Sequence, residues 1–435
     1  MRRLLGVVDS DSYVKWGAAL LSHLPSDEWD VELVTVESRL AASESQLGSA
    51  LAGSAFGPDA APRATLQQIV EKLSSEGHDA VFVSTSGAVS EAVITEVTQK
   101  VRPRPVIMTG LPGISSPPKY KGLFRRAQAD LFVLHSHREI REYQALAASR
   151  GMTHNVVLAT LPFLEHVDEH EFDAAGRDSI VFAAQPGVPW TLDDRQALVD
   201  KLVETAAAHP GLRVVIKVRA QAGERQTHRE KYPYAELVPK NAPKNLVVEG
   251  GAMSDHLARA VGFLTVSSTA AIEAIAARVP SLVLDHFGVS AELINLVFTG
   301  SGLLGGFDDL VAARFHAVDP SWRQDNYFHP VSDNDWQQQL DAMATLRDLG
   351  ELSERPAQRQ SRGGAIRRAW DRKRAFGPYD RTLSGYAAAA IGYPVLIVRD
   401  ALGSLRGTSG PLRSADDESD GNESDGEVTT RASRA

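Results

Sequence analysis

The residues best suited to chemistry are three consecutive hydroxyl side chains, Ser267, Ser268 and Thr269, with the carboxylate of Glu273 one turn further along. An apolar, strand-like segment (263–266) precedes them, and an alanine-rich, helix-like segment follows. Small hydroxyl residues between a strand and a helix bring unpaired backbone N–H groups and the positive end of the helix dipole to a phosphate. Glu273 is placed to accept the hydroxyls of a ribose or a sugar. A Ser/Thr helix cap with an acidic capping box fits the same residues, and the pattern alone does not separate the two interpretations.

Two cations, Lys217 and Arg219, close a second apolar segment (212–218) and stand two residues apart, so they share one side of the strand. Ligands of open α/β sheets bind beyond the carboxyl ends of the strands, where two cations suit a diphosphate or a carboxylate. Gln185 ends another strand before a Pro/Gly-rich turn and is a third candidate to line this cleft. The alternatives are ordinary surface charge for the cations and a rigid strand-to-helix connection for Gln185.

Two carboxylates, Asp9 and Asp11, follow the first apolar strand and are candidates for a general base that deprotonates an acceptor hydroxyl. Asp-x-Asp also resembles a metal-binding pair, but metal ligation needs more oxygen ligands than the sequence identifies, so we expect no metal. Helix capping by Asp11 or Ser12 is the alternative. A Gly/Pro-rich loop (109–122) could face an acceptor across the cleft, and a plain long loop is the alternative.

Three other patterns fail their context tests. Residues 300–305 spell G-x-G-x-x-G, but a helical-looking stretch (291–298) precedes them, whereas the dinucleotide fingerprint requires a strand. His166 and His170 have metal-like spacing but lie in a polar segment, where we expect them to be solvated. His135 and His137 end a strand, but most histidines at such positions are not catalytic.

Apolar strand-like runs alternate with helix-like segments along most of the chain, which is typical of βαβ units on a parallel sheet. Strands are expected at 4–8, 31–36, 80–84, 105–109, 130–135, 156–159, 179–184, 212–218, 246–248, 263–266 and 281–284, and helices at 13–24, 65–73, 89–101, 138–150, 192–209, 253–260, 270–277 and 384–405. We therefore predict the α/β class, with two Rossmann-like parallel-sheet domains facing a cleft. The predicted parts are a first (acceptor) domain at 1–164, a linker, a second (nucleotide-donor) domain at 179–345, basic and apolar helices at 346–410, and a disordered acidic tail at 411–435.

Composition excludes several function classes. The 435 residues are 43% hydrophobic and 23% charged, so wholesale disorder is excluded. The absence of cysteine excludes disulfides, thiol catalysis and cysteine-ligated metals, and a net charge of −9 argues against nucleic-acid binding. The first apolar run has five residues, fewer than a secretory signal needs, so we expect a cytoplasmic protein.

The segment 355–398 combines a basic stretch with an apolar one and is a candidate for peripheral contact with the inner face of an anionic membrane. Packing of this segment against the first domain is the alternative, and we favour it.

Two Rossmann-like halves with a phosphate-type turn only in the second half look like a GT-B glycosyltransferase. More narrowly, Lys217-Val-Arg219 and the run 265–273 resemble the C-terminal domains of bacterial polysialyltransferases, capsule Kdo transferases and CDP-glycerol glycerophosphotransferases. The resemblance covers residues 179–309. In those families a Lys-x-His-Pro segment and a Ser-Ser/Thr segment contact the donor nucleotide. Here Arg219-Ala stands in place of His-Pro, and an arginine can offset charge but cannot donate a proton near neutral pH.

The resemblance implies a metal-independent transferase that moves a sugar or polyol-phosphate from a nucleotide-activated donor to a cell-surface glycan or lipid-linked acceptor, without a cofactor. The phosphate would contact Ser267, Ser268 and Thr269, and the two cations would stabilise leaving-group charge. A nucleotide-sugar 2-epimerase of the same fold is one alternative. A two-domain binding protein whose catalytic groups are lost is another, motivated by the missing His-Pro pair.

Overall fold

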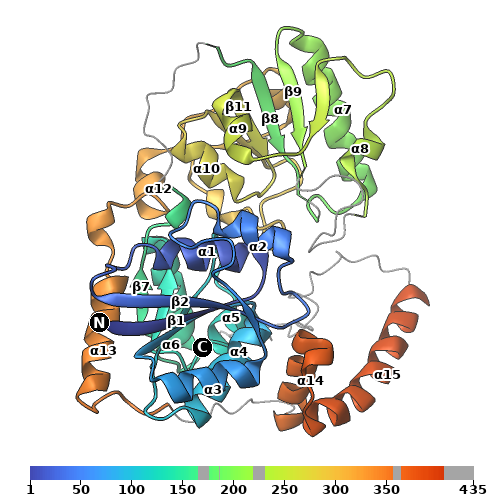
Figure 1. Ribbon diagram of the computed structural model, residues 1–435. Coiled ribbons are helices and arrows are strands. Elements are labelled where there is room, and N and C mark those ends of the chain that lie inside the picture. The colour runs from blue at the N-terminus through green and yellow to red at the C-terminus, as the bar shows by residue number, and fades with distance from the viewer. Residues whose placement is uncertain (165–175, 186, 219–230, 356–363, 406–435) are drawn as a thin grey trace, which may run out of the picture.

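The computed structural model describes residues 1–164, 176–185, 187–218, 231–355 and 364–405. Two α/β domains, each built on its own parallel sheet, face one another (Figure 1). The predicted acidic tail, most of the predicted linker and Arg219 lie outside the described residues.

The first domain is built on a seven-stranded parallel sheet of order β3-β2-β1-β4-β5-β6-β7. Its strands are β1 (Arg2–Val8), β2 (Trp29–Val36), β3 (Arg63–Ala64), β4 (Ala80–Ser84), β5 (Val106–Gly110), β6 (Leu131–Leu134) and β7 (Val156–Leu158). Its helices are α1 (Asp11–Leu21), α2 (Glu44–Leu51), α3 (Leu66–Glu76), α4 (Gly87–Lys100), α5 (Tyr120–Phe124) and α6 (His137–Ser149).

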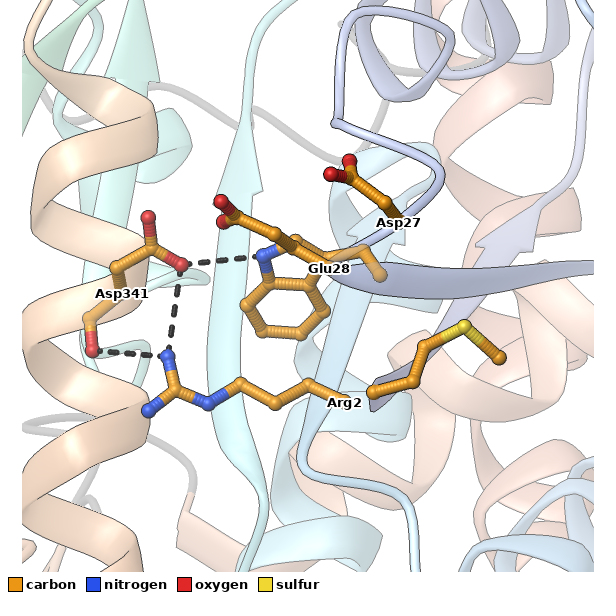
Figure 2. Close-up of a pocket in the computed structure, with 6 residues that line it drawn as sticks. Arg2, Asp27, Glu28 and Asp341 are labelled. Carbon is orange, nitrogen blue, oxygen red and sulfur yellow. Dashed lines mark hydrogen bonds and ion pairs between the residues drawn. The ribbon is translucent and has the colours of Figure 1, made fainter.

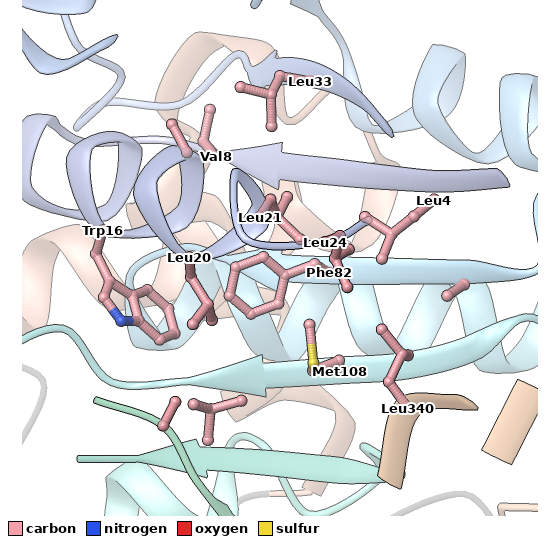
Figure 3. Close-up of a cluster of buried hydrophobic side chains, with 14 of the residues drawn as sticks. Leu4, Val8, Trp16, Leu20, Leu21, Leu24, Leu33, Phe82, Met108 and Leu340 are labelled. Atoms are coloured by element: carbon pink, nitrogen blue, oxygen red, sulfur yellow. The ribbon is translucent and has the colours of Figure 1, made fainter. Parts of the chain in front are cut away.

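Both faces of this sheet are covered, which is why its central strands are continuous apolar runs. Leu4 and Val8 of β1 pack in one core with Phe82 and with side chains of α1 and α2 (Figure 3). Leu5 and Val7, which alternate with them, pack on the opposite face in a core with α3 and α4.

The second domain has a six-stranded parallel sheet of order β10-β9-β8-β11-β12-β13. Its strands are β8 (Ser179–Ala183), β9 (Arg213–Lys217), β10 (Leu246–Glu249), β11 (Ala260–Thr265), β12 (Ser281–Leu284) and β13 (Leu304–Gly305). Its helices are α7 (Leu192–Ala208), α8 (Tyr234–Leu237), α9 (Met253–Ala258), α10 (Ala270–Ala276), α11 (Phe307–Val311) and α12 (Pro320–Asp325). In the first sheet the strand order reverses between the adjacent strands β1 and β4, and in the second sheet it reverses between β8 and β11. Open α/β sheets bind their ligands at the carboxyl ends of strands beside such a reversal.

The predicted fold class is confirmed, and every predicted strand has a counterpart in the two sheets. The helical-looking stretch 291–298 contains turns and one short 3₁₀ helix, Leu296–Phe298, instead of an α-helix. Ile294 has a φ of 58°, a left-handed value that a continuous α-helix cannot accommodate.

A helix late in the chain, α13 (Trp336–Asp348), returns to the first domain. Trp336, Leu340 and Ala344 join the core that contains β1 and α1. Asp341 accepts a hydrogen bond from the indole of Trp29 at 3.1 Å and pairs with Arg2 at 3.5 Å (Figure 2). The predicted domain boundary at 345 assigns most of α13 to the second domain, whereas its contacts are with the first.

The last two described helices, α14 (Gly364–Phe376) and α15 (Leu383–Leu405), lie side by side at the edge of the first domain (Figure 1). Phe376 of α14 joins the core formed by α3 and α4, and the Ala375 carbonyl accepts a hydrogen bond from the Arg39 amide at 2.9 Å. Across the described residues, no helix combines the length and apolar character that crossing a membrane requires.

Candidate functional site

The carboxyl ends of β8 and β11 meet in the second domain, and hydrogen bonds join the residues that follow the two strands. The side-chain oxygen of Gln185 accepts two hydrogen bonds from Ser267, from its backbone N–H at 3.1 Å and from its hydroxyl at 2.9 Å. The Ser268 amide donates to the Thr265 hydroxyl at 3.0 Å, and the Ala270 amide donates to the Ser268 hydroxyl at 3.2 Å. These bonds hold the hydroxyl triplet in one conformation beside the strand ends.

Lys217 ends β9, the next strand of the sheet, at the same edge. The register aligns Lys217 with Ala183 of β8, so it lies beside the turn that contains Gln185. Its strand neighbours Val214 and Ile216 face the α7 core, so by alternation Lys217 projects from the opposite face of the sheet. Lys217 is 9% exposed, an unusual degree of burial for a lysine. The structure thus places Gln185, Lys217 and the triplet at adjacent strand ends.

The other residues of the predicted donor site differ in exposure. Thr269 is exposed, Ser267 is buried, and Ser268 and Glu273 are half-buried. Glu273 is on the first turn of α10. The α10 helix has seven residues, so the dipole at its start is weaker than that of a long helix.

The first domain contacts the edge of the triplet through the loop that follows β5. A Cβ built on Gly113 of this loop would lie 3.3 Å from the methyl carbon of Thr269. The neighbouring Ile114 packs against the second-domain core that includes Ala270 and Ala271. This is the Gly/Pro-rich loop (109–122), for which the sequence left open a role at the cleft or a plain long loop, and it places the triplet at the boundary between the domains.

A buried carboxyl that sequence reasoning missed, Glu139 on α6, links this loop to the second domain. Its Oε1 accepts hydrogen bonds from the Ser115 amide and from the Tyr327 hydroxyl of the second domain, each at 2.6 Å. Its Oε2 accepts from the His135 amide at 3.1 Å. Glu139 is 0% exposed, and burial raises its pKa to about 7. Glu139 stands three residues after the N-cap Ser136, a position at which an acidic residue is common for capping alone, so the local sequence does not distinguish it.

Further contacts join α6 to the second domain. Arg138 donates to the Val297 carbonyl at 3.0 Å, and Arg141 forms a bidentate pair with Asp325 at 2.6 and 2.7 Å. The α6 helix is therefore one of the elements that fix the two domains relative to each other.

His135, at the end of β6, is part of the first-domain core. Its Nε2 accepts from the indole N–H of Trp16 at 2.8 Å, so Nδ1 carries the hydrogen and donates to the Ala159 carbonyl at 2.8 Å. Burial lowers the pKa of His135 to about 4. A neutral ring with both nitrogens engaged orients Trp16 and does not supply a proton to the cleft.

The two predicted base residues occupy different environments. Asp9 is 0% exposed, and its Oδ2 accepts from the Ser86 amide at 2.9 Å and from the Ser86 hydroxyl at 2.7 Å. Its Oδ1 accepts from the Ser10 amide at 2.6 Å, so Asp9 joins the end of β1 to the start of α4. Asp11 is exposed at the first position of α1, a helix on the side that faces the second domain (Figure 1). The hydrogen bonds of Asp9 to Ser10 and Ser86 hold its carboxylate within the first domain.

A cluster of metal-ligand type lies elsewhere in the first domain. Ligand atoms of Glu32, Glu76 and His78 are within 4.8 Å of one another. Arg3 and Lys72 each pair with both carboxylates, and these cations already satisfy the oxygens. The cluster is therefore an ion-pair network, and we do not infer a metal site from it.

The hollow in Figure 2, lined by Met1, Arg2, Asp27, Glu28, Trp29 and Asp341, lies at the amino ends of β1 and β2. Ligands of open α/β sheets bind at the opposite, carboxyl ends, so this hollow is not the expected substrate site.

A family model described as "Putative glycosyltransferase (DUF6716)" matches residues 4–343. The chain belongs to this family. The match runs from β1 into α13 and so includes both sheets, the triplet and the domain boundary. No curated protein matches the chain at a significant level.

Several solved structures with a similar fold are nucleotide-sugar enzymes, at low identity. The "putative UDP-N-acetylglucosamine 2-epimerase" of Listeria monocytogenes has a TM-score of 0.55 and 12% identity, covering 82% of this chain and 98% of its own. The S. aureus MnaA–UDP structure has a TM-score of 0.51 and 12% identity, covering 83% and 100%. The UDP-GlcNAc 2-epimerase of Methanocaldococcus jannaschii has a TM-score of 0.51 and 10% identity, covering 79% and 100%. This likeness shows that the DUF6716 chain has a GT-B-like fold.

Proposed function

We propose that this protein transfers a glycosyl or polyol-phosphate group from a nucleotide-activated donor to a cell-surface glycan or lipid-linked acceptor. The observation that carries the proposal is the meeting of Gln185, Lys217 and the hydroxyl triplet at adjacent strand ends, beside a loop of the other domain. The description of the family supports a glycosyltransferase. The structural neighbour solved with UDP supports a nucleotide donor.

The donor phosphates would lie against the triplet. Ser267 already donates both its N–H and its hydroxyl to Gln185, so Ser268 and Thr269 are better placed to bind a phosphate in this conformation. The Ser268 hydroxyl accepts one bond from Ala270 and keeps its own hydrogen for a phosphate oxygen. Glu273 would accept donor hydroxyls.

In the transfer, the acceptor oxygen forms a bond to the reacting carbon or phosphorus while the bond to the nucleotide phosphate breaks. The nucleotide leaves with the electron pair, and Lys217 and Arg219 would stabilise its developing charge. The acceptor proton would go to a carboxylate of the first domain. Asp9 and Asp11 are the candidates, and Asp11 is the exposed one. Domain closure would bring this base to the acceptor.

Calorimetric titration with UDP, CDP, CMP and GDP tests donor binding. We expect one of them to bind saturably. Ser268→Ala and Lys217→Met should each weaken that binding about 10- to 100-fold, because hydrogen bonds to charged groups contribute about 1.5–3 kcal/mol. The control Ser49→Ala removes an exposed serine hydroxyl of α2 and should leave affinity unchanged. Absence of saturable binding by all four nucleotides would refute the proposal.

The structural neighbours favour one alternative, a nucleotide-sugar 2-epimerase. The protein can be incubated, without an acceptor, with sugar derivatives of whichever nucleotide binds. This distinguishes the two reactions, because only an epimerase converts the nucleotide-sugar to its 2-epimer. A catalytically degenerate binding protein would bind nucleotide but leave the donor unchanged with any acceptor.

A further inference from the structure

The C-terminal hairpin of α14 and α15 is attached to the first domain through α14. Arg372 of α14 approaches Glu96 of α4 at 3.8 Å, and Phe376 is buried in the α3/α4 core. The α15 helix packs mainly on α14. A Cβ on Gly392 would collide with Trp370, and the Trp370 and Tyr393 rings meet at 5.2 Å. Ala388 on this inner side is 3% exposed.

The other side of α15 is an apolar stripe exposed to solvent. Leu383 is 87% exposed and Ile391 60%, and Ala387 and Ala390 between them are also exposed. Ala387 follows Leu383 by four residues, and Ala390 and Ile391 follow Ala387 by three and four, so the four side chains share one side of the helix. The sequence 382–394 contains no charged residue. A continuous exposed apolar surface of this kind marks an interaction site.

The charge beside this stripe has the opposite sign to that of the whole protein. Residues 364–381 contain six Arg or Lys and two Asp, a net charge of +4, whereas the chain has a net charge of −9. Arg381, immediately before α15, is exposed.

We propose that the exposed stripe of α15, defined by Leu383, Ala387, Ala390 and Ile391, docks the protein on an anionic lipid bilayer. The helix would lie in the plane of the interface, with its apolar side among the acyl chains and the +4 segment near the headgroups. A second copy of the chain on the same stripe would bring two +4 segments together, whereas an anionic surface neutralises them. Charge complementarity therefore favours the bilayer over self-association.

Vesicle co-sedimentation of the full chain tests this proposal. We expect binding to phosphatidylcholine vesicles that contain phosphatidylglycerol, much weaker binding to pure phosphatidylcholine, and release by salt. The double variant Leu383→Glu/Ile391→Glu should reduce partitioning on the order of tenfold or more. The matched control Val331→Glu/Leu349→Glu changes two similarly exposed apolar residues, 64% and 66% exposed, and should bind like the wild type.

Several outcomes would overturn the proposal. These are failure to bind anionic vesicles, equal binding to neutral vesicles, or equal loss in the two double variants. Light scattering measures the molecular mass in solution. A wild-type dimer that becomes monomeric only in Leu383→Glu/Ile391→Glu would show that a second copy covers the stripe and would also overturn the proposal. Thermal melting of each variant verifies that it is folded, which is expected because all four substituted side chains are exposed. Nucleotide binding is measured separately, so failure of this proposal is distinguishable from failure of the proposed function.

Discussion

Replacing Glu139 by Gln should remove a specific pH dependence from the stability of the protein. Burial raises the pKa of Glu139 to about 7 from an ordinary value of 4.5. Below pH 4.5 the carboxyl is protonated in both the folded and the unfolded chain. Between these two values the folded state keeps the proton and the unfolded state loses it, so the Glu139 contribution to the free energy of unfolding falls as pH rises. Above about pH 7 the carboxyl is ionised in both states, and its contribution to the free energy of unfolding falls no further.

The size of the effect follows from the two pKa values. At about 1.4 kcal/mol per pKa unit, the difference between 4.5 and about 7 is worth about 3 kcal/mol. Buried histidines act in the opposite sense. His135 has its pKa lowered from 6.5 to about 4, so its contribution increases as pH rises through that range. The wild-type curve alone therefore does not isolate Glu139, and the difference between variant and wild type is the informative quantity.

Urea unfolding of wild type and Glu139→Gln at a series of pH values measures that difference. The variant should gain up to about 3 kcal/mol relative to wild type between about pH 4.5 and pH 8. Any packing cost of the amide is independent of pH and does not affect this slope. Tyr327→Phe keeps the carboxyl but removes a hydrogen bond that lowers its pKa. The loss of stability with rising pH that the wild type shows should therefore persist in this variant and shift to higher pH. A stability difference between Glu139→Gln and wild type that is constant across pH would refute the reasoning.

Three further substitutions have expected outcomes that thermal or urea unfolding measures. Gly110→Ala should destabilise the protein by about 1–3 kcal/mol, because the new Cβ would lie 2.5 Å from the Val133 carbonyl oxygen; wild-type stability would contradict this contact. Gly48→Ala should stabilise the protein by up to about 1 kcal/mol, since Gly48 is inside α2 with open space around it. A loss of stability would show that the new methyl group meets a neighbouring atom. Arg104→Ala should cost about 3–5 kcal/mol, because Asp130 is 1% exposed and pairs with Arg104 at 2.6 Å; a loss below 1 kcal/mol would show that Arg355 or water compensates.

The strands and most long helices could be predicted because their signals are local. A strand covered on both faces is an uninterrupted apolar run, and β1, β4 and β8 are such runs. The meeting of Gln185 with Ser267 also follows from topology, since both residues end adjacent strands at the point where the chain direction reverses. The sequence predicted that each of these residues ends a strand, and the strand order of the folded sheet brings the two together.

Other features depend on contacts between segments far apart in the chain. Trp336, Leu340 and Ala344 form an amphipathic pattern, but the pattern does not say which domain receives it. Glu139 has the sequence signature of a helix cap, and only the folded chain brings Tyr327 to it. Likewise, nothing in the local sequence around Asp9 indicates that Ser86 occupies its carboxylate.

The return of α13 to the first domain has a consequence for synthesis on the ribosome. The first domain is not a contiguous stretch of polypeptide, because its core includes Leu340 and Ala344. The nascent chain must therefore keep the receiving surface beside Trp29 uncovered while the whole second domain is translated. A fragment that stops at residue 164 would carry that apolar surface permanently exposed, and we expect such a fragment to aggregate.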